Sequence, residues 1–287
     1  MRPQVAVFPV AGLGTRILPA SKSVPKELLP VLERPLLQYA VEEALATGCR
    51  TLVFVLNREK LALVDYFDRS LLLEQRLSAG GKAELLAGLR GLLPADARCL
   101  FALQSEPLGL GHAVLCAREA VGGRPFAVLL PDELLLGEPP ALEQLARAAE
   151  RRSAPALAVM EVAETETGRY GIVAGTELDA SGLLRIERLV EKPRPEEAPS
   201  RLAAVGRYLL DPEIFPLLEG LAPGANGELQ LSDAIARLAA RREVLALRIE
   251  AERYDCGQLP GWLTANLRLA LRRPELRPAI EELLRRP

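Results

Sequence analysis

The sequence predicts an α/β protein with an open, mostly parallel sheet flanked by helices and an inserted, strand-rich lobe. Two observations lead to this prediction. In the first half of the chain, short apolar runs alternate with amphipathic stretches, as in sheets whose two faces are both covered by helices. In the second half, strand-like segments follow one another with little helix between them, which is typical of a more antiparallel arrangement.

The first half begins with a continuous apolar run at residues 5–10, which predicts a buried strand. Helical periodicity over residues 36–47 stops at a glycine, and the apolar run at residues 51–56 predicts a second buried strand. The remaining elements expected here are helices at residues 60–67, 71–77 and 113–120 and strands at residues 99–103 and 125–130.

The second half contains most of the strands that are not separated by long helices. The expected strands are residues 156–162, 171–173, 184–190, 203–210 and 244–249. The expected helices are residues 217–220, 231–239, 263–273 and 279–285. Because no repeat and no low-complexity linker interrupts the chain, these segments favour one continuous domain over residues 1–287.

Composition excludes several classes of protein. The formal net charge of the 287 residues is −2, so no basic field points to nucleic acid. No apolar run reaches the roughly 18 residues of a membrane helix, and the N-terminus lacks the layout of a signal peptide. Four scattered cysteines and one histidine do not form a zinc pattern, and we expect these cysteines to be reduced. We therefore expect a cytoplasmic protein that binds neither nucleic acid nor membranes.

The segment FPVAGLGTRILPASKSVPKELLP at residues 8–30 carries the clearest functional signal. It follows the first strand, at the edge where open α/β sheets bind their ligands. Its glycines allow backbone N–H groups to approach a ligand, and Arg16, Lys22 and Lys26 add positive charge. A polyphosphate fits these features. Ile17 stands where the dinucleotide fingerprint needs a third glycine, and no P-loop motif occurs.

The longer stretch AGLGTRILPASKSVPKELLPVLERPLLQY resembles the signature of the sugar-phosphate nucleotidyltransferases, whose core is GxGTR, a spacer and PK. Further matches follow in order: FDRSLLLE, Gln104 before GLGHAV, LLPDE, YGIV, VEKPRP, VGRYLL, GELQLSDAI and YDCG. They span about residues 5–261 and are most similar to the bacterial uridylyltransferase branch of the family. The resemblance implies a Rossmann-like fold with a nucleotide-binding half (1–150), a sugar-phosphate-binding part (151–260) and C-terminal helices (261–287).

The resemblance also implies a reaction. Glucose 1-phosphate attacks the α-phosphorus of UTP in line and yields UDP-glucose and pyrophosphate. The nucleophile is already anionic, so catalysis consists of positioning and charge neutralisation rather than proton abstraction. The family habit favours a homo-oligomer. Two alternatives stay open: thymidylyl transfer to the same sugar phosphate, because thymine differs from uracil by one methyl group, and a catalytically silent regulatory subunit that binds nucleotide sugars.

By the same resemblance, charged residues take the catalytic roles. Arg16 and Lys26 stabilise the α-phosphate and the departing pyrophosphate, and Lys192 binds the sugar phosphate. Asp132 follows the strand at residues 125–130, and Asp255 follows the strand at residues 244–249. These two aspartates are expected to hold one Mg²⁺, which accepts few carboxylates when phosphate oxygens and water complete its shell.

Uncharged residues complete the expected site. The amide of Gln104 has a donor and an acceptor that match the uracil edge, and His112 is expected to order its loop. Glu191 is expected to accept hydrogen bonds from sugar hydroxyls. The remaining residues implied for the nucleotide are Ala11, Gly12, Gly14, Thr15 and Gly109, and those implied for the sugar phosphate are Gly171, Val205 and Gly206.

Four positions depart from the family pattern. Leu103 stands where an arginine often precedes the base-reading glutamine, and Leu108 replaces a common lysine. Leu259 and Pro260 replace the lysine and leucine that usually follow the second aspartate. The departures remove positive charge near the expected nucleotide, while the residues assigned to metal and phosphates are all present.

Overall fold

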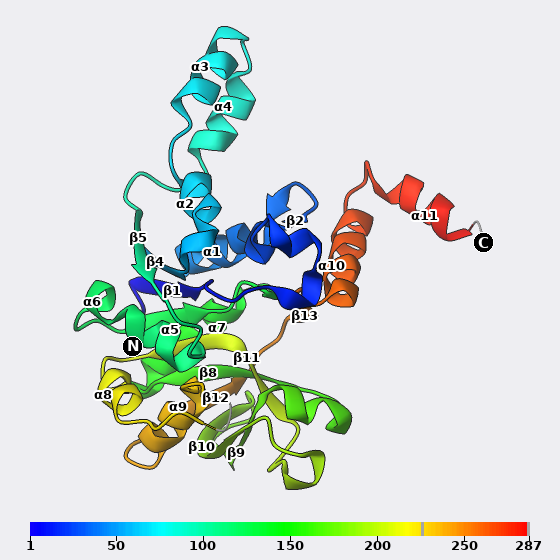
Figure 1. Ribbon diagram of the computed structural model, residues 1–287. Helices are drawn as coiled ribbons and strands as arrows, with labels where there is room; N and C mark the ends of the chain where they lie inside the picture. Colours follow the sequence, from blue (N-terminus) through cyan, green and yellow to red (C-terminus); the bar gives the residue numbers. More distant parts are fainter. Residues whose placement is uncertain (225–226, 286–287) are drawn as a thin grey trace.

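A nine-stranded sheet runs through the whole protein, which is described here by a computed structural model covering residues 1–224 and 227–285 (Figure 1). Its strands are β1 (Val5–Pro9), β4 (Thr51–Leu56), β5 (Arg98–Leu103), β6 (Phe126–Leu129), β8 (Ala156–Glu161), β9 (Gly171–Glu177), β10 (Leu183–Glu191), β11 (Leu202–Leu210) and β12 (Leu245–Arg248). Their order across the sheet is β5-β4-β1-β6-β11-β8-β12-β10-β9.

The direction of the strands changes at β11. Strands β5, β4, β1 and β6 are all parallel, as the alternation of apolar runs and helices predicts. Strand β11 runs antiparallel to both β6 and β8, and β10 runs antiparallel to β12 and β9. The predicted α/β fold is therefore confirmed, and the strand-rich second half is hydrogen-bonded into the same sheet.

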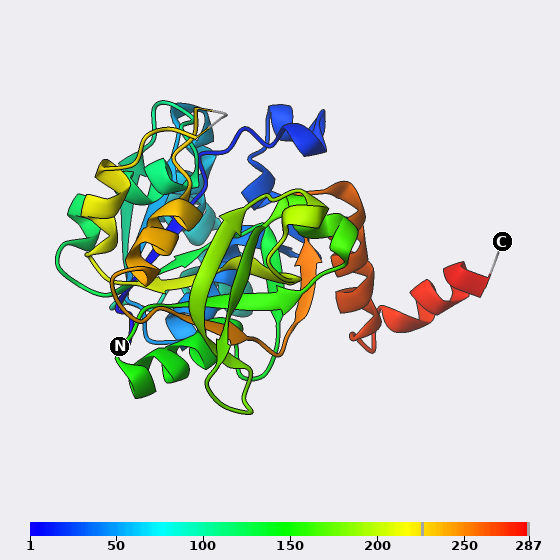
Figure 2. The same cartoon turned by 90° about the horizontal axis from the view of Figure 1, so that it is seen from below.

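Helices cover both faces of this sheet (Figure 2). One face packs against α1 (Leu36–Ala46), α2 (Ala62–Phe67) and α7 (Ala141–Arg152), and the other against α5 (Leu110–Cys116), α8 (Ile214–Glu219) and α9 (Leu231–Ala239). Alternation along β1 divides its residues between the two cores: Ala6 and Phe8 pack toward α1, and Val5 and Val7 pack toward α5.

Several helices lie outside these two layers. Helices α3 (Leu71–Ala79) and α4 (Ala83–Arg90) form a projection beyond α2, and α11 (Arg277–Arg285) extends away from α10 (Leu259–Leu271) (Figure 1). The helix expected at residues 113–120 is divided into α5 and the short α6 (Arg118–Val121). Within the described part of the chain, none of the helices combines the length and the apolar character needed to cross a bilayer.

Two small strand pairs stand apart from the main sheet. Strands β2 (Pro30–Val31) and β3 (Arg34–Pro35) pair with each other, and β7 (Glu133–Leu136) pairs with β13 (Glu252–Asp255). The prediction that Asp255 follows the strand at residues 244–249 is wrong, because β12 ends at Arg248 and the separate strand β13 carries Asp255. This pairing places Asp255 opposite Glu133, which directly follows Asp132 in the sequence.

Candidate active site

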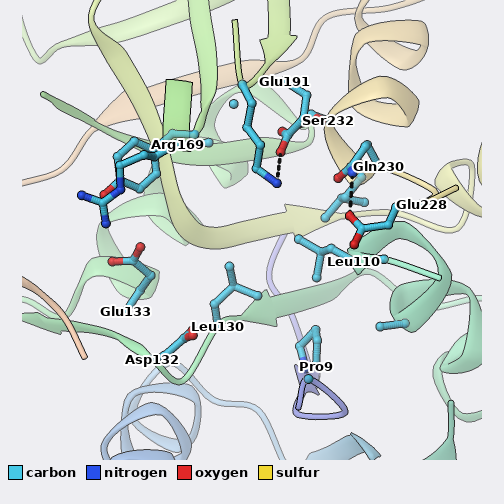
Figure 3. A pocket seen from close by; sticks show the side chains of 18 of the residues that line it. Pro9, Leu110, Leu130, Asp132, Glu133, Arg169, Glu191, Glu228, Gln230 and Ser232 are labelled. Carbon is cyan, nitrogen blue, oxygen red and sulfur yellow. Dashed lines mark hydrogen bonds and ion pairs between the residues drawn. The ribbon is translucent and has the colours of Figure 1, made fainter. Parts of the chain in front are cut away.

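A cleft of about 820 Å³ opens where β1, β5 and β6 end, across from the start of β9 and the end of β10 (Figure 3). Parallel strands that end together place their following loops side by side, which is the usual ligand position in open α/β sheets. Most of the site residues predicted from the sequence line this cleft: Ala11, Gly12, Thr15, Arg16, Lys26, Gln104, Gly109, Asp132, Gly171, Glu191, Lys192 and Asp255.

The loop after β1 is shaped by short turns that bring its cations to the cleft. The side chain of Asn57 donates to the carbonyl oxygen of Ala11 at 2.7 Å, which fixes the start of the loop. Gly14 has a φ of 69°, and its carbonyl oxygen accepts from Ser21 Oγ at 2.7 Å. A side chain at Gly14 would meet Ser21 at 3.2 Å and Lys26 at 3.5 Å, so this glycine packs under Lys26 instead of lining the cleft.

Lys26 and Asp132 form an ion pair on the floor of the cleft. Burial lowers the pKa of Lys26, but the charges of Asp132 and Glu27 outweigh burial and hold that pKa above its usual value. Burial likewise raises the pKa of Asp132, and Lys26 outweighs it, so the pKa of Asp132 lies below its usual value. Both groups are therefore charged at neutral pH and ready to act on an ionic ligand.

A second ion pair, which is buried, joins Lys60 to Glu27, the residue after Lys26. Lys60 Nζ donates to both carboxylate oxygens of Glu27, at 2.9 and 2.7 Å, and Glu27 is 2% exposed. Glu27 follows Lys26 in the short turn Lys26–Leu28. The pair thus anchors this turn to the turn Arg58–Lys60 after β4, and sequence analysis did not identify either partner.

Asp255 and Asp132 border one small space beside Gly257. A Cβ atom at Gly257 would lie 3.0 Å from Asp132 Oδ2 and 3.1 Å from Asp255 Oδ1, so only glycine leaves this space open. Cys256 N donates to the carbonyl oxygen of Asp132 at 2.8 Å and holds the two segments together. Two carboxylates that face one open space form an arrangement able to hold a cation.

Arg169, which the sequence analysis did not single out, holds Asp255 from the opposite wall. Its Nη2 lies 2.6 Å from Asp255 Oδ2, and its guanidinium stands 5.4 Å from the centre of the Tyr170 ring. The guanidinium of Arg253 lies 4.6 Å from the centre of the same ring. Arg253 also donates two hydrogen bonds of 2.8 Å to the carboxylate of Glu133. No sequence signal marks these contacts, because they join segments that are far apart along the chain.

Gln104 lies at the end of β5 and is 6% exposed. Its Nε2 donates to the carbonyl oxygen of Gly109 at 3.1 Å and lies 3.1 Å from His112 Nδ1. Gly109 has a φ of 93°, and a side chain there would approach Glu228 at 2.8 Å. This glycine therefore allows the loop to pack closely against the segment that contains Glu228 and Leu229.

The far wall of the cleft is formed by β9 and β10 and the start of α9. Glu191 accepts from Ser232 Oγ at 2.8 Å and lies 3.5 Å from Lys192 Nζ (Figure 3). Lys192 has a φ of 44°, an uncommon value for a residue other than glycine, and its side chain is 47% exposed. A side chain at Gly171 would meet Glu191 Oε2 at 3.2 Å, so this glycine keeps Glu191 accessible.

Besides Gly14, three expected residues do not line the cleft. Val205 is fully buried and packs toward α7, because alternation along β11 turns it to the opposite face, while Ala204 and Tyr208 line the cleft. Gly206 has a φ of 80° at a register shift of β11, and its carbonyl oxygen accepts from Leu130 N at 2.9 Å. Lys22 is exposed in the turn Ala20–Lys22 and stands outside the cleft.

The positions that depart from the family pattern lie around the cleft rather than in its floor. The side chain of Leu103 is 52% exposed and that of Leu259 is 57% exposed. Pro260 lies in the first turn of α10, and the carbonyl oxygen of Leu108 accepts from Leu229 N at 2.8 Å. None of these four positions takes part in the ion pairs Lys26–Asp132 and Arg169–Asp255.

The fold and the cleft agree with a family match. The model of the Nucleotidyl transferase family matches residues 6–271, and the chain belongs to this family. A UTP--glucose-1-phosphate uridylyltransferase from Pseudomonas aeruginosa is 44% identical over 264 residues, which cover 91% of this chain and 93% of that protein.

Solved structures show the same architecture over almost the whole chain. A UTP-bound UGPase from Acinetobacter baumannii is 39% identical and superposes with a TM-score of 0.90, covering 99% of both chains. A UDP-glucose pyrophosphorylase complexed with UDP-glucose is 38% identical, with a TM-score of 0.87 over 95% of this chain and 100% of that chain.

Proposed function

We propose that this protein is a uridylyltransferase that forms UDP-glucose and pyrophosphate from UTP and glucose 1-phosphate. One observation supports this proposal above the others: the cleft holds cations and paired carboxylates at one end and the Glu191–Lys192 pair at the other. The relatives with this activity cover almost the whole chain, so the comparison extends to both ends of the cleft.

Asp132 and Asp255 are proposed to hold one Mg²⁺. The open space beside Gly257 fits this ion, because both carboxylates border it and a single side chain would fill it. Over residues 1–224 and 227–285, no cluster of three or more potential ligands exists, so phosphate oxygens and water are needed to complete the shell, as Mg²⁺ prefers. When bound, Mg²⁺ would neutralise charge on the nucleotide phosphates.

The cations of the cleft are proposed to act directly on the phosphates. Lys26 pairs with Asp132 and can turn to a phosphate oxygen once the carboxylate has another partner. Arg16 is exposed at the cleft and contributes positive charge to both members of that pair. These side chains stabilise the charge that develops on the departing pyrophosphate, which is the main catalytic requirement of phosphoryl and nucleotidyl transfer.

Base recognition is proposed for Gln104, and its hydrogen bonds support a particular way of reading uracil. Sequence analysis expected the amide to offer both a donor and an acceptor, but its nitrogen is occupied by Gly109 and His112. The amide oxygen is then the group that meets the base, and it accepts from the N3–H of uracil. Cytosine carries no hydrogen at N3, so two acceptors would face each other.

With glucose 1-phosphate, UTP is expected to exceed CTP in kcat/KM by about tenfold or more, because an unpaired buried acceptor costs about 1–3 kcal/mol. Pyrophosphate release measured with UTP, dTTP, CTP, GTP and ATP tests the proposal. Thymine has the same hydrogen-bonding edge, so any margin over dTTP reflects the methyl group or the ribose 2′-OH. A preference for dTTP would assign the chain to thymidylyl transfer, and equal use of UTP and CTP would contradict the role of Gln104.

Lys192→Ala is expected to raise the KM for glucose 1-phosphate by about tenfold or more, because a charge-assisted phosphate contact contributes roughly 1.5–3 kcal/mol. The KM for UTP is expected to change much less, since Lys192 lies on the wall formed by β9 and β10. Initial rates with each substrate varied in turn give both constants. Arg194→Ala, two residues further along, is the matched control; an unchanged KM for glucose 1-phosphate in Lys192→Ala would place Lys192 outside the site.

A cytoplasmic location and a homo-oligomeric state remain predictions. The projecting helices carry exposed leucines that a second copy of the chain could cover, among them Leu71, Leu72, Leu85 and Leu283. Sedimentation equilibrium of the purified protein measures the oligomeric state directly.

A further inference from the structure

We propose that His112 is a specificity-determining residue: it positions the side-chain amide of Gln104 so that only the amide oxygen faces the nucleobase. The inference rests on the proposed function, in which Gln104 reads the base. It gives a role to the single histidine of the chain, which is not one of the charged groups of the cleft.

The orientation of the Gln104 amide follows from its two partners. The carbonyl oxygen of Gly109 can only accept, so the amide group 3.1 Å away must present its nitrogen to it. The same nitrogen lies 3.1 Å from His112 Nδ1, and an amide nitrogen carries two hydrogens. One hydrogen is directed to Gly109 and the other to His112, so no donor is left for a ligand.

The amide oxygen of Gln104 is not fully buried. Across the described ranges, no fully buried side-chain nitrogen or oxygen lacks a hydrogen-bond partner. Within these ranges no protein group donates to Gln104 Oε1, so this oxygen is accessible although the residue as a whole is 6% exposed. Gln104 lines both the main cleft and an adjoining cavity of about 390 Å³ that it shares with Ala11 and Leu13. A base in this region meets an acceptor.

The same contacts indicate the tautomer of His112. Because Nδ1 accepts from Gln104, the ring proton of the neutral imidazole resides on Nε2. Nε2 stands 3.8 Å from Cys116 Sγ, one helical turn further along α5. The start of this helix is fixed by the hydrogen bond from Gly111 N to the carbonyl oxygen of Leu229, at 2.8 Å. In this tautomer, Nδ1 is an acceptor toward Gln104 and Nε2 faces Cys116.

Rotation of the amide by half a turn would bring its oxygen against two acceptors, Gly109 O and His112 Nδ1. With His112 in this tautomer, the double mismatch disfavours rotation and favours the amide orientation that accepts from uracil. Without His112, one of the two contacts is lost and the amide can more readily present its nitrogen to the base. A cytosine N3 would then find a donor, and the preference for uracil would decrease.

The test is the ratio of kcat/KM for UTP to kcat/KM for CTP, measured with glucose 1-phosphate for the wild type, His112→Leu, Gln104→Leu and the double variant. Both constants come from one preparation, so the ratio does not depend on the fraction of folded enzyme. Gln104→Leu is expected to lower the ratio by about tenfold or more and His112→Leu by about three- to tenfold. In the double variant, the ratio should equal that of Gln104→Leu, because His112 acts through Gln104.

Leu115→Ala is the matched control, since Leu115 lies on the same helix, is half-buried and packs against the core. It is expected to leave the ratio unchanged even where it lowers stability. An unchanged ratio in His112→Leu, or an equal decrease with and without Gln104, would overturn the proposal. If the wild-type protein uses neither UTP nor CTP, the proposed function itself is contradicted. The wild-type assay alone reveals this outcome.

Discussion

Asp132→Asn and Asp255→Asn are each expected to lower kcat/KM for UDP-glucose formation by about 10²-fold or more, since removal of one preorganised charge-stabilising group has effects of this size. Each substitution removes one of the two charges that border the space beside Gly257 and leaves the size of the side chain unchanged. Rates measured over a range of Mg²⁺ concentrations should show a higher Mg²⁺ requirement in both variants.

Asp211→Asn provides the comparison for these variants. Asp211 is also a largely buried aspartate with an arginine partner, Arg242, at 2.9 Å, but it follows β11 away from the cleft. Its substitution should leave the Mg²⁺ requirement unchanged. Wild-type rates and an unchanged Mg²⁺ requirement in both cleft variants would refute the assignment of Asp132 and Asp255.

The second large effect is expected in stability. Arg207→Leu should lower the free energy of unfolding by about 3–5 kcal/mol, because it leaves a buried carboxylate without its partner. Arg207 is 1% exposed, and its Nη2 lies 2.7 Å from Glu43 Oε2. Its Nη1 donates to the carbonyl oxygens of Leu130 and Glu133, at 3.1 and 2.6 Å, on either side of Asp132. Urea unfolding of the purified variants measures the change.

Two further variants separate the buried pair from arginine contacts in general. The double variant Arg207→Leu with Glu43→Leu should be less destabilised than the sum of the single variants, because neither charge is then left alone. Arg118→Leu removes an exposed ion pair with Glu219, in which 43% and 49% of the two side chains are exposed, and should cost about 0–1 kcal/mol. A loss of less than about 1 kcal/mol in Arg207→Leu would contradict the argument.

The central strands could be predicted from the sequence because burial on both faces requires continuous apolar runs, and β1, β4 and β6 have them. Strand β13 could not, since its residues Glu252–Asp255 are polar and only half-buried. Helix α7 was also missed, although its six buried positions, four of which are alanines, follow a clear helical period.

The candidate site likewise combines residues that the sequence predicts with contacts that it does not predict. Lys26, Asp132 and Gln104 follow from their motifs and from the positions of strand ends, both of which are local properties of the sequence. The contact of Arg169 with Asp255 joins residues separated by 86 positions, and that of Arg207 with Glu43 spans 164. Only the packed structure reveals such pairs. Val205 was expected to line the cleft, but alternation along β11 turns it toward α7, while Ala204 and Tyr208 face the cleft.

The most direct test of uridylyl transfer is the identity of the product. We expect the ³¹P NMR spectrum of the purified protein with UTP, glucose 1-phosphate and Mg²⁺ to show the two coupled diphosphate resonances of UDP-glucose. Pyrophosphate should appear in equal amount, while UTP and glucose 1-phosphate disappear together. Hydrolysis of UTP without consumption of glucose 1-phosphate, or no reaction under conditions where the folded protein binds UTP, would contradict the account.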